Sequence, residues 1–260
     1  MVRIAVIALK GGVGKSTTTA CLADYVANSA GNPKTLIIDG DPQSTMKAFF
    51  GLQVTGIIDF AEFFLGEKSI DTFQPVKLQD ATIDVMVASK RLSDADTIIT
   101  GFKREERLKN RLDDQVLPHE FLFFDTAPSI TITTWNILLA SDYIIIPVTL
   151  DVLSMHAVNA TTDAVVALKK AYGYGPSILG ILPTMHDLRS TISAEALTEI
   201  KEFAKAAKIK VFSPIGVDAL VKRSQTKRQS LFEMPSSRAA QQYAAVGKYL
   251  LSKVKGSTNG

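Results

Sequence analysis

The chain has 260 residues, of which 46% are hydrophobic and 21% are charged. This composition is typical of a folded protein with a sizeable core and argues against a disordered chain. A single cysteine, Cys21, excludes an internal disulfide framework and a metal site built on paired cysteines, and it is consistent with a reducing compartment. The sequence shows neither a leader-like start nor an apolar run long enough to span a bilayer, so we expect a cytoplasmic protein.

The net charge of +3 is unevenly distributed along the chain. Residues 1–150 contain 14 Lys and Arg against 18 Asp and Glu, whereas residues 151–260 contain 15 against 8. A basic excess in one half indicates a face that meets an anionic surface. The charge alone does not distinguish nucleic acid from membrane.

Short apolar runs alternate with helical patterns along the chain. Arg3–Leu9 predicts a buried strand, a glycine-rich turn follows, and Ser16–Ala30 predicts a helix. Further predicted strands are Thr35–Asp39, Ile83–Val87, Phe121–Phe124, Tyr143–Pro147 and Ile178–Leu182, and further predicted helices are Met155–Tyr172 and Ser193–Ala207. Wholly apolar strands that alternate with helices predict one α/β domain over residues 1–254. We expect a mostly parallel, twisted sheet with helices on both faces, and a disordered tail over residues 255–260.

The first predicted strand is followed by a loop with the residues of a phosphate-binding turn. Residues 10–17 are Lys-Gly-Gly-Val-Gly-Lys-Ser-Thr. The glycines let backbone amides turn toward an anion, and the following helix adds its positive end. Lys15 can reach the outer phosphates of a nucleotide, and the Ser16 hydroxyl can ligate Mg²⁺. Leu9 replaces the leading glycine of the usual pattern, and a glycine-rich turn without a ligand is the alternative.

Residues 10–17 resemble the deviant Walker A motif of the ParA/MinD group of ATPases. In that group the first lysine of the motif, here Lys10, reaches across a dimer to the nucleotide of the other subunit. Residues 39–43, Asp-Gly-Asp-Pro-Gln, resemble the group's Walker A′ or switch I segment. Residues 121–129 resemble its Walker B and switch II, with Ala127 where the family most often has proline. The resemblance covers almost the whole chain and implies a single-domain P-loop NTPase that hydrolyses ATP with Mg²⁺.

The resemblance also assigns roles to polar residues. Asp41 orients the attacking water, and Lys10 of the partner subunit stabilises charge on the transferring phosphate. Asp125 holds the hydration shell of Mg²⁺, and Asp39 supports the metal site. Each acid could instead cap a helix or hold a turn, as acids after strands often do. The implied phosphate and metal contacts are Lys10, Gly11, Gly12, Val13, Gly14, Lys15, Ser16, Thr17, Asp39 and Asp125.

The adenine contact is taken from the same resemblance. Family members place the base near a late strand and the loop after it, which here correspond to residues 184–185 and 213–215. Pro214 is the residue that we expect to contact the base. A proline that merely ends a strand is the alternative.

Residues 201–228 carry eight basic side chains against two acids. Such a stretch can follow DNA phosphates without reading bases, although a solvated lysine face is the alternative. Arg189 matches a position where ParA-like proteins often carry a basic residue. The predicted DNA contacts are Arg189, Lys201, Lys205, Lys222, Arg223, Lys227 and Arg228.

The last helical pattern offers a rival interpretation. Tyr243, Val246, Leu250 and Val254 form one stripe with lysines beside it, and MinD-like proteins end in a membrane-seeking amphipathic helix. The alanines between these residues favour close packing on the sheet, so we expect a core helix.

The resemblance therefore implies a short ParA-type partition ATPase, without an N-terminal DNA-reading domain because its first strand starts at Arg3. In the implied cycle, ATP joins two subunits into a sandwich dimer that binds DNA non-specifically on the nucleoid. A ParB-like centromere-binding partner then triggers hydrolysis, which drives plasmid or chromosome partition. The alternatives are a MinD-like membrane-cycling ATPase and a ParA-like positioner of non-DNA cargo.

Overall fold

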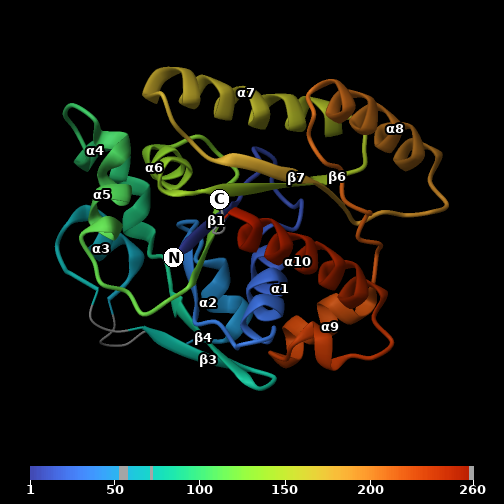
Figure 1. Cartoon of the computed structure of the whole chain (residues 1–260), viewed down its shortest axis with the longest axis horizontal. Helices are drawn as coiled ribbons and strands as arrows, with labels where there is room; N and C mark the ends of the chain where they lie inside the picture. The colour runs from blue at the N-terminus through green and yellow to red at the C-terminus, as the bar shows by residue number, and fades with distance from the viewer. Residues whose placement is uncertain (53–57, 71–72, 258–260) are drawn as a thin grey trace.

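The computed structural model describes residues 1–52, 58–70 and 73–257 and contains one seven-stranded sheet (Figure 1). The strands are β1 (Val2–Val6), β2 (Thr35–Gly40), β3 (Gln74–Leu78), β4 (Ala81–Met86), β5 (Phe121–Thr126), β6 (Tyr143–Thr149) and β7 (Ser177–Thr184). Their order is β3-β4-β2-β5-β1-β6-β7, and every pairing is parallel except that of β3 with β4. The predicted mostly parallel sheet is confirmed.

Helices cover both faces of the sheet (Figure 1). One face carries α1 (Lys15–Ala27), α2 (Thr45–Phe50), α9 (Ala219–Lys227) and α10 (Arg238–Ser257). The other carries α3 (Phe60–Leu65), α4 (Ala95–Ile98), α5 (Arg107–Asp113), α6 (Ile132–Ala140), α7 (Ser154–Tyr172) and α8 (Thr191–Ala206). Short 3₁₀ turns are η1 (Lys90–Asp94), η2 (Arg104–Glu106) and η3 (Leu231–Glu233). Each face of the sheet therefore has its own apolar core.

Strand β3 is the element that the sequence analysis does not predict. It pairs antiparallel with β4 at the edge of the sheet, after a turn in which Gln79 has a φ of 54°. Only one side of β3 is covered, so its residues alternate between partly buried and exposed positions, and Pro75 lies within it. Pro75 is tolerated because an edge strand has backbone amides that need no ladder partner. A search for wholly apolar runs therefore passes over this strand.

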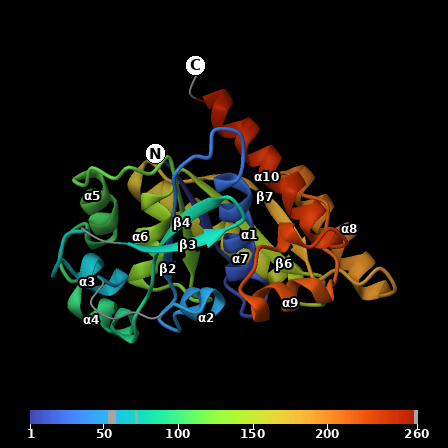
Figure 2. The ribbon, with the colours of Figure 1, turned by 90° about the horizontal axis from the view of Figure 1, so that it is seen from below.

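The C-terminal helix α10 packs along α1 (Figure 2). Tyr243, Val246, Leu250 and Val254 are each at most 6% exposed, so the expected core helix is confirmed. Within the described chain, no helix combines the length and apolar character that crossing a bilayer requires. Helix α10 continues to Ser257, past the predicted domain end at residue 254, and residues 258–260 of the predicted tail lie outside the described residues.

The strand order determines where a ligand can bind. The central strand β1 lies between β5 and β6, and β5 in turn pairs with β2. The loops that follow β1, β2 and β5 therefore leave the same edge of the sheet side by side. In open parallel sheets, ligands bind outside the carboxyl ends of the strands where the strand order changes direction.

The contact between α1 and α10 can be tested at Gly247. A Cβ at this position would lie 2.2 Å from Cδ1 of Tyr25 on α1, so any side chain here overfills the interface. We expect Gly247→Val to lower the free energy of unfolding by about 1–3 kcal/mol in urea titrations. Ala245→Val, at an exposed position of the same helix, is the control. Equal stability of the two variants would contradict this packing.

Candidate functional site

The loop between β1 and α1 presents an open row of backbone amides. Gly12 and Gly14 have φ values of 73° and 82°, a left-handed conformation that residues with a Cβ rarely adopt. A Cβ at Gly11 or Gly12 would meet no atom within 4 Å, so the space above the loop is open. Gly14 is the N-cap of α1 and supplies no side chain to its first amides. These amides are thus available to an anion.

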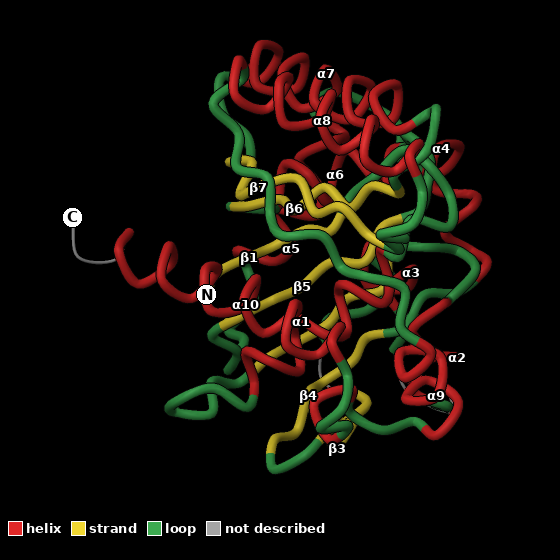
Figure 3. Tube along the Cα trace, turned by 90° about the vertical axis from the view of Figure 1, so that its right-hand side faces the viewer, coloured by secondary structure: helices red, strands yellow, loops and turns green. Residues whose placement is uncertain are grey.

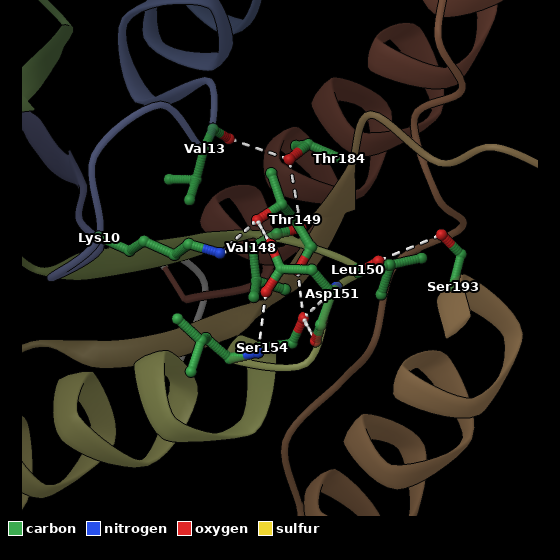
Figure 4. A network of polar contacts seen from close by, with 10 residues as sticks. Lys10, Val13, Val148, Thr149, Leu150, Asp151, Ser154, Thr184 and Ser193 are labelled. Atoms are coloured by element: carbon green, nitrogen blue, oxygen red, sulfur yellow. Dashed lines mark hydrogen bonds and ion pairs between the residues drawn. The ribbon is translucent and has the colours of Figure 1, made fainter. Parts of the chain in front are cut away.

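The loop is held in place by the end of β7. The hydroxyl of Thr184 donates to the carbonyl oxygen of Val13 at 2.9 Å and lies 3.2 Å from the carbonyl oxygen of Val148 (Figure 4). The Val13 side chain is fully buried beneath the loop. One buried hydroxyl therefore links the loop to the ends of β6 and β7.

Lys15 lies at the end of the loop and is only 7% exposed. Its Nζ donates to the carbonyl oxygen of Lys10 at 3.2 Å. Burial lowers the pKa of Lys15, while the charges of Asp125 and Asp41 act in the opposite direction. The ammonium is therefore attached to the loop and interacts electrostatically with both carboxylates.

The two acids Asp39 and Asp125 occupy paired positions on β2 and β5 and are fully buried. The carboxylate of Asp39 accepts the backbone amide of Asp41 at 3.1 Å and that of Met46 at 2.9 Å. Burial and the charge of Asp125 raise the pKa of Asp39 well above its usual range. Both oxygens of Asp39 thus have donors, and this side chain orders the segment between β2 and α2.

Asp125 differs because one of its oxygens has no donor. Oδ1 accepts the backbone amide of Thr126 at 3.1 Å, whereas Oδ2 is buried without a partner among the described residues. Burial raises the pKa of Asp125 to about 7, against the opposing effects of the nearby Ser16 hydroxyl and the charge of Lys15. An unpaired buried carboxylate oxygen beside a hydroxyl fits a hard divalent cation.

The protein alone supplies too few ligands to enclose such a cation. Within the described parts of the chain, no group of three or more His, Cys, Asp or Glu side chains could hold a metal ion. Mg²⁺ is usually held by one or two carboxylates together with phosphate oxygens and water. The donor set of Ser16 and Asp125 fits a magnesium ion that arrives with a nucleotide.

Asp41 lies at a turn and at the edge of a cavity. Its Oδ1 accepts the amide of Gln43 at 2.9 Å, and its carbonyl oxygen accepts the amide of Ser44 at 2.8 Å. Asp41 and Gln43 line one side of the cavity, and residues 127–129 after β5 line the other. Asp41 is therefore a turn residue, which is the alternative that the sequence allowed. It also lies beside the cavity between the two switch segments.

Lys10 turns toward its own chain (Figure 4). Its Nζ donates to the Thr149 hydroxyl at 3.0 Å and forms an ion pair with Asp151 at the end of β6. Despite its partial burial, the pKa of Asp151 is lowered by hydrogen bonds from Lys10 and Thr149. Sequence reasoning missed Asp151 because this residue, two positions after the end of β6, belongs to none of the motifs that carry the resemblance.

An apolar pocket adjoins the loop on the side of β7. The pocket is formed by three groups of residues: the loop, the segment after β7, and helices α9 and α10. Its lining includes Gly14, Thr17, Thr184, Met185, Ile215, Gly216, Val217, Asp218, Val221, Lys222, Gln225 and Tyr243. The predicted base contact Pro214 is not among these residues, whereas its neighbours Ile215 and Gly216 are. Of the residues expected near the base, Thr184, Met185 and Ile215 line this pocket, whereas Pro214 does not.

Two pocket residues escaped the sequence analysis because their partners are far away in the chain. Gln225 on α9 donates from Nε2 to the Thr17 hydroxyl at 3.0 Å, across a separation of 208 residues. The hydroxyl groups of Tyr243 on α10 and Thr18 lie 3.3 Å apart. The Gln225 hydrogen bond thus attaches α9 to the first turn of α1, and the Tyr243 contact joins α10 to the same turn.

The predicted DNA contacts are divided among three places. Lys222, Arg223, Lys227 and Arg228 are exposed on α9 and its C-cap, although Lys222 also lines the pocket beside the loop. Lys201 and Lys205 are exposed on α8, which covers the opposite face of the sheet (Figure 1). Arg189 is exposed and pairs with Asp187, with Nε 3.2 Å from Oδ1. The predicted set is therefore not one surface.

Comparisons with known proteins agree with this fold. A family model described as an AAA domain matches residues 1–174. The chain is 27% identical to the chromosome partitioning protein ParA of Myxococcus xanthus over 249 residues, which cover 94% of this chain and 86% of that protein. It is 28% identical to the sporulation initiation inhibitor protein Soj of Bacillus subtilis over 252 residues, which cover 94% of this chain and 96% of that protein.

A solved structure shows the same fold. The ATP complex of a McdA variant from Cyanothece superposes with a TM-score of 0.86 at 23% identity, covering 96% of each chain. The shared fold thus extends over almost the whole of both proteins, including the strands that carry the loop and the two acids.

The raised pKa of Asp125 predicts a pH-dependent cost to folding. An aspartate with a raised folded-state pKa favours folding at low pH, and this contribution is lost as the pH rises from the unfolded value through about 7. Without nucleotide and Mg²⁺, we expect Asp125→Asn to be more stable than the wild type at pH 8, with the difference shrinking toward pH 5. Urea unfolding across this range measures it.

Asp163→Asn, at an exposed position of α7, is the control and should show no such trend. An Asp125→Asn variant that is less stable than the wild type at every pH would contradict the assignment of an unfavourable buried charge.

Proposed function

The chain belongs to the AAA domain family and is a P-loop ATPase, and on this premise we propose that it is a ParA-like partition ATPase. It binds Mg-ATP, forms an ATP-sandwich dimer and binds DNA without sequence preference. One observation carries the proposal: the buried Asp125 oxygen that has no partner in the described chain, next to Lys15 and Ser16 below the phosphate loop. A triphosphate with its metal supplies the positive charge and ligands that this oxygen lacks.

ATP and Mg²⁺ fit the groups around the loop. The amides after Lys10 bind phosphate oxygens, and Lys15 neutralises charge on the outer phosphates. Ser16 and Asp125 hold Mg²⁺, and Asp39 supports this site by fixing the backbone of Asp41. When bound, Mg²⁺ would supply positive charge that neutralises the charge developing on the phosphate oxygens during transfer. The base enters the pocket beside Ile215 and Gly216.

Hydrolysis requires an oriented water molecule more than a covalent catalyst. Asp41 is the residue that we assign to this water. Its position beside the cavity between the two switch segments supports the assignment. The backbone amides that Asp39 binds keep Asp41 within this wall.

Lys10 completes the site of a second subunit. Its ion pair with Asp151 is partly exposed, with side chains 26% and 41% accessible, and such pairs contribute little net stability. Lys10 can therefore leave Asp151 and reach a phosphate that a partner subunit holds. This exchange links nucleotide binding to dimerisation.

The exposed basic residues of α9 are the part of the surface that we assign to DNA. Phosphate contacts of this kind bind DNA without regard to sequence. The ATP-bound dimer accordingly associates with the nucleoid in the cytoplasm. A ParB-like partner stimulates hydrolysis and release, and the cycle moves a plasmid or chromosome. The names of the relatives from Myxococcus and Bacillus support partition as the setting.

A MinD-like membrane cycle receives less support. It needs an amphipathic terminal helix with a free apolar face. The apolar stripe of α10 is buried against α1 and the sheet. Within the described chain this helix therefore has a structural role.

The role of Asp41 predicts a separation of binding from turnover. Asp41→Ala should retain Mg-ATP binding and ATP-dependent dimerisation but lower the hydrolysis rate about 100-fold or more, because the water loses its orienting group. Nucleotide titration, sedimentation and phosphate release measure the three properties. Lys15→Ala, which should lose nucleotide binding itself, is the control. Hydrolysis by Asp41→Ala at the wild-type rate would remove Asp41 from the mechanism.

The DNA surface can be tested with residues that lie outside the nucleotide pocket. Arg223→Glu with Lys227→Glu should weaken binding to a duplex of arbitrary sequence about tenfold or more at moderate salt, and should leave basal hydrolysis intact. Lys201→Glu with Lys205→Glu on α8 makes the same charge change on the opposite face of the sheet. A larger loss of DNA binding from the α8 pair than from the α9 pair would move the DNA surface to α8.

A further inference from the structure

An open cleft adjoins the switch I segment, and its lining includes none of residues 10–17 of the phosphate loop. Its walls are α2 with the residues just before and after it, the turn that follows β4, and the C-cap of α9. Helices α2 and α9 lie side by side at this corner of the molecule (Figure 3). With a volume of about 790 Å³, the cleft is much larger than a single phosphate ion requires. Its size therefore points to an extended ligand.

Three cations from three different elements line the cleft. They are Lys47 on α2, Lys90 at the start of η1, and Arg228 at the C-cap of α9. All three are exposed, and within the described residues none makes an ion pair or a side-chain hydrogen bond. The lining contains one acid, Asp59, whose Oδ1 already accepts the amide of Glu62 at 2.9 Å. The cleft thus carries a positive charge that its own residues do not neutralise.

Two hydroxyl groups in the same walls also lack partners. Oγ of Ser44 and Oγ of Ser89 are buried, and neither has a hydrogen-bond partner in the described parts of the chain. Both residues line the cleft. Buried hydroxyl groups are normally satisfied, so an unpaired pair beside three free cations indicates an acceptor that comes from outside the chain. A phosphate oxygen is such an acceptor.

Arg228 is fixed at the junction of α2 and α9. Its guanidinium lies against Gly51, where a Cβ would come within 2.2 Å of Cζ. Gly51 has a φ of 64° and ends α2, so glycine suits both the backbone and the contact. Arg228 therefore extends the exposed basic surface of α9 into the cleft. Lys47 and Lys90 extend this basic surface along the other walls of the cleft.

We propose that this cleft is a second phosphate-binding site, in which Lys47, Lys90 and Arg228 hold the sugar–phosphate backbone of nucleic acid that lies across α9. This inference rests on the proposed DNA binding. It adds Lys47 and Lys90 to the proposed DNA contacts, and both residues lie outside the basic C-terminal half of the chain. Cations on three elements suit successive phosphates better than one anion. Among the residues that the structure describes, no strongly exposed large apolar side chain lines the cleft, which disfavours a membrane surface.

The position of the cleft connects nucleic acid to hydrolysis. Ser44 belongs to the turn in which its amide donates to the carbonyl oxygen of Asp41 at 2.8 Å. A phosphate bound at Ser44 therefore acts on the same turn that positions the water-orienting carboxylate. The cleft and the ATPase site therefore share one short segment of backbone, the turn from Asp41 to Ser44.

The test compares two double variants of the full chain that lose the same charge. Lys47→Gln with Lys90→Gln alters the cleft. Lys34→Gln with Lys170→Gln alters exposed lysines before β2 and at the end of α7. Binding to a fluorescent duplex of arbitrary sequence is measured by anisotropy over a salt series, with Mg²⁺ and a slowly hydrolysed ATP analogue. Nucleotide binding is measured in parallel to verify that each variant is folded.

We expect the cleft variant to bind DNA about tenfold or more weakly at moderate salt, with a salt slope smaller by about 2, because two phosphate contacts are lost. The control variant should stay close to the wild type. If the wild type binds DNA and both variants bind equally well, the cleft assignment is wrong while the proposed function stands. If the wild type itself binds no DNA, the proposed function is wrong. A cleft variant that loses binding to anionic phospholipid vesicles but keeps its DNA affinity would overturn nucleic acid as the ligand.

Discussion

Two buried carboxylates on neighbouring strands determine the arrangement of the site. The parallel register of β2 and β5 places Asp39 and Asp125 side by side where water is excluded. Two like charges in such a place are costly unless hydrogen bonds or cations compensate them. Asp39 is compensated by backbone amides, which fix the segment leading to α2. Asp125 is compensated only in part, by Lys15 and Ser16, and this remaining demand for positive charge is what a metal-bound nucleotide satisfies.

The same short segments serve several sites, which explains how they can influence one another. The turn from Asp41 to Ser44 forms a wall of the cavity between the switch segments and a wall of the cleft beside α2. Helix α9 lies between that cleft and the apolar pocket beside β7, and Gln225 joins it to the first turn of α1. Only Ser224 of α9 is buried, so this helix is weakly packed and its position can respond to what occupies either side. Binding of a nucleotide and binding of nucleic acid would thus both affect the position of α9.

The sequence predicts most reliably the features that are encoded by neighbouring residues. The phosphate loop is a contiguous pattern of glycines, lysines and hydroxyl residues, and the six predicted strands are predominantly apolar continuous runs, so both are visible without a structure. Strand β3 is missed because only one of its sides is covered. Asp151 and Gln225 are missed because tertiary packing, across more than a hundred residues, selects their partners Lys10 and Thr17. The separation of Lys201 from Lys222 onto opposite faces follows from chain topology, which a count of basic residues does not contain.

The central claim is that the loop and the two carboxylates bind a metal-bound triphosphate, and that this ligand joins two subunits. Sedimentation of the purified chain with a slowly hydrolysed ATP analogue, with and without Mg²⁺, tests it most directly. The account predicts a monomer without the metal and a dimer when both ligands saturate the protein. A chain that binds no analogue, or that remains monomeric when saturated with it and Mg²⁺, would contradict the account.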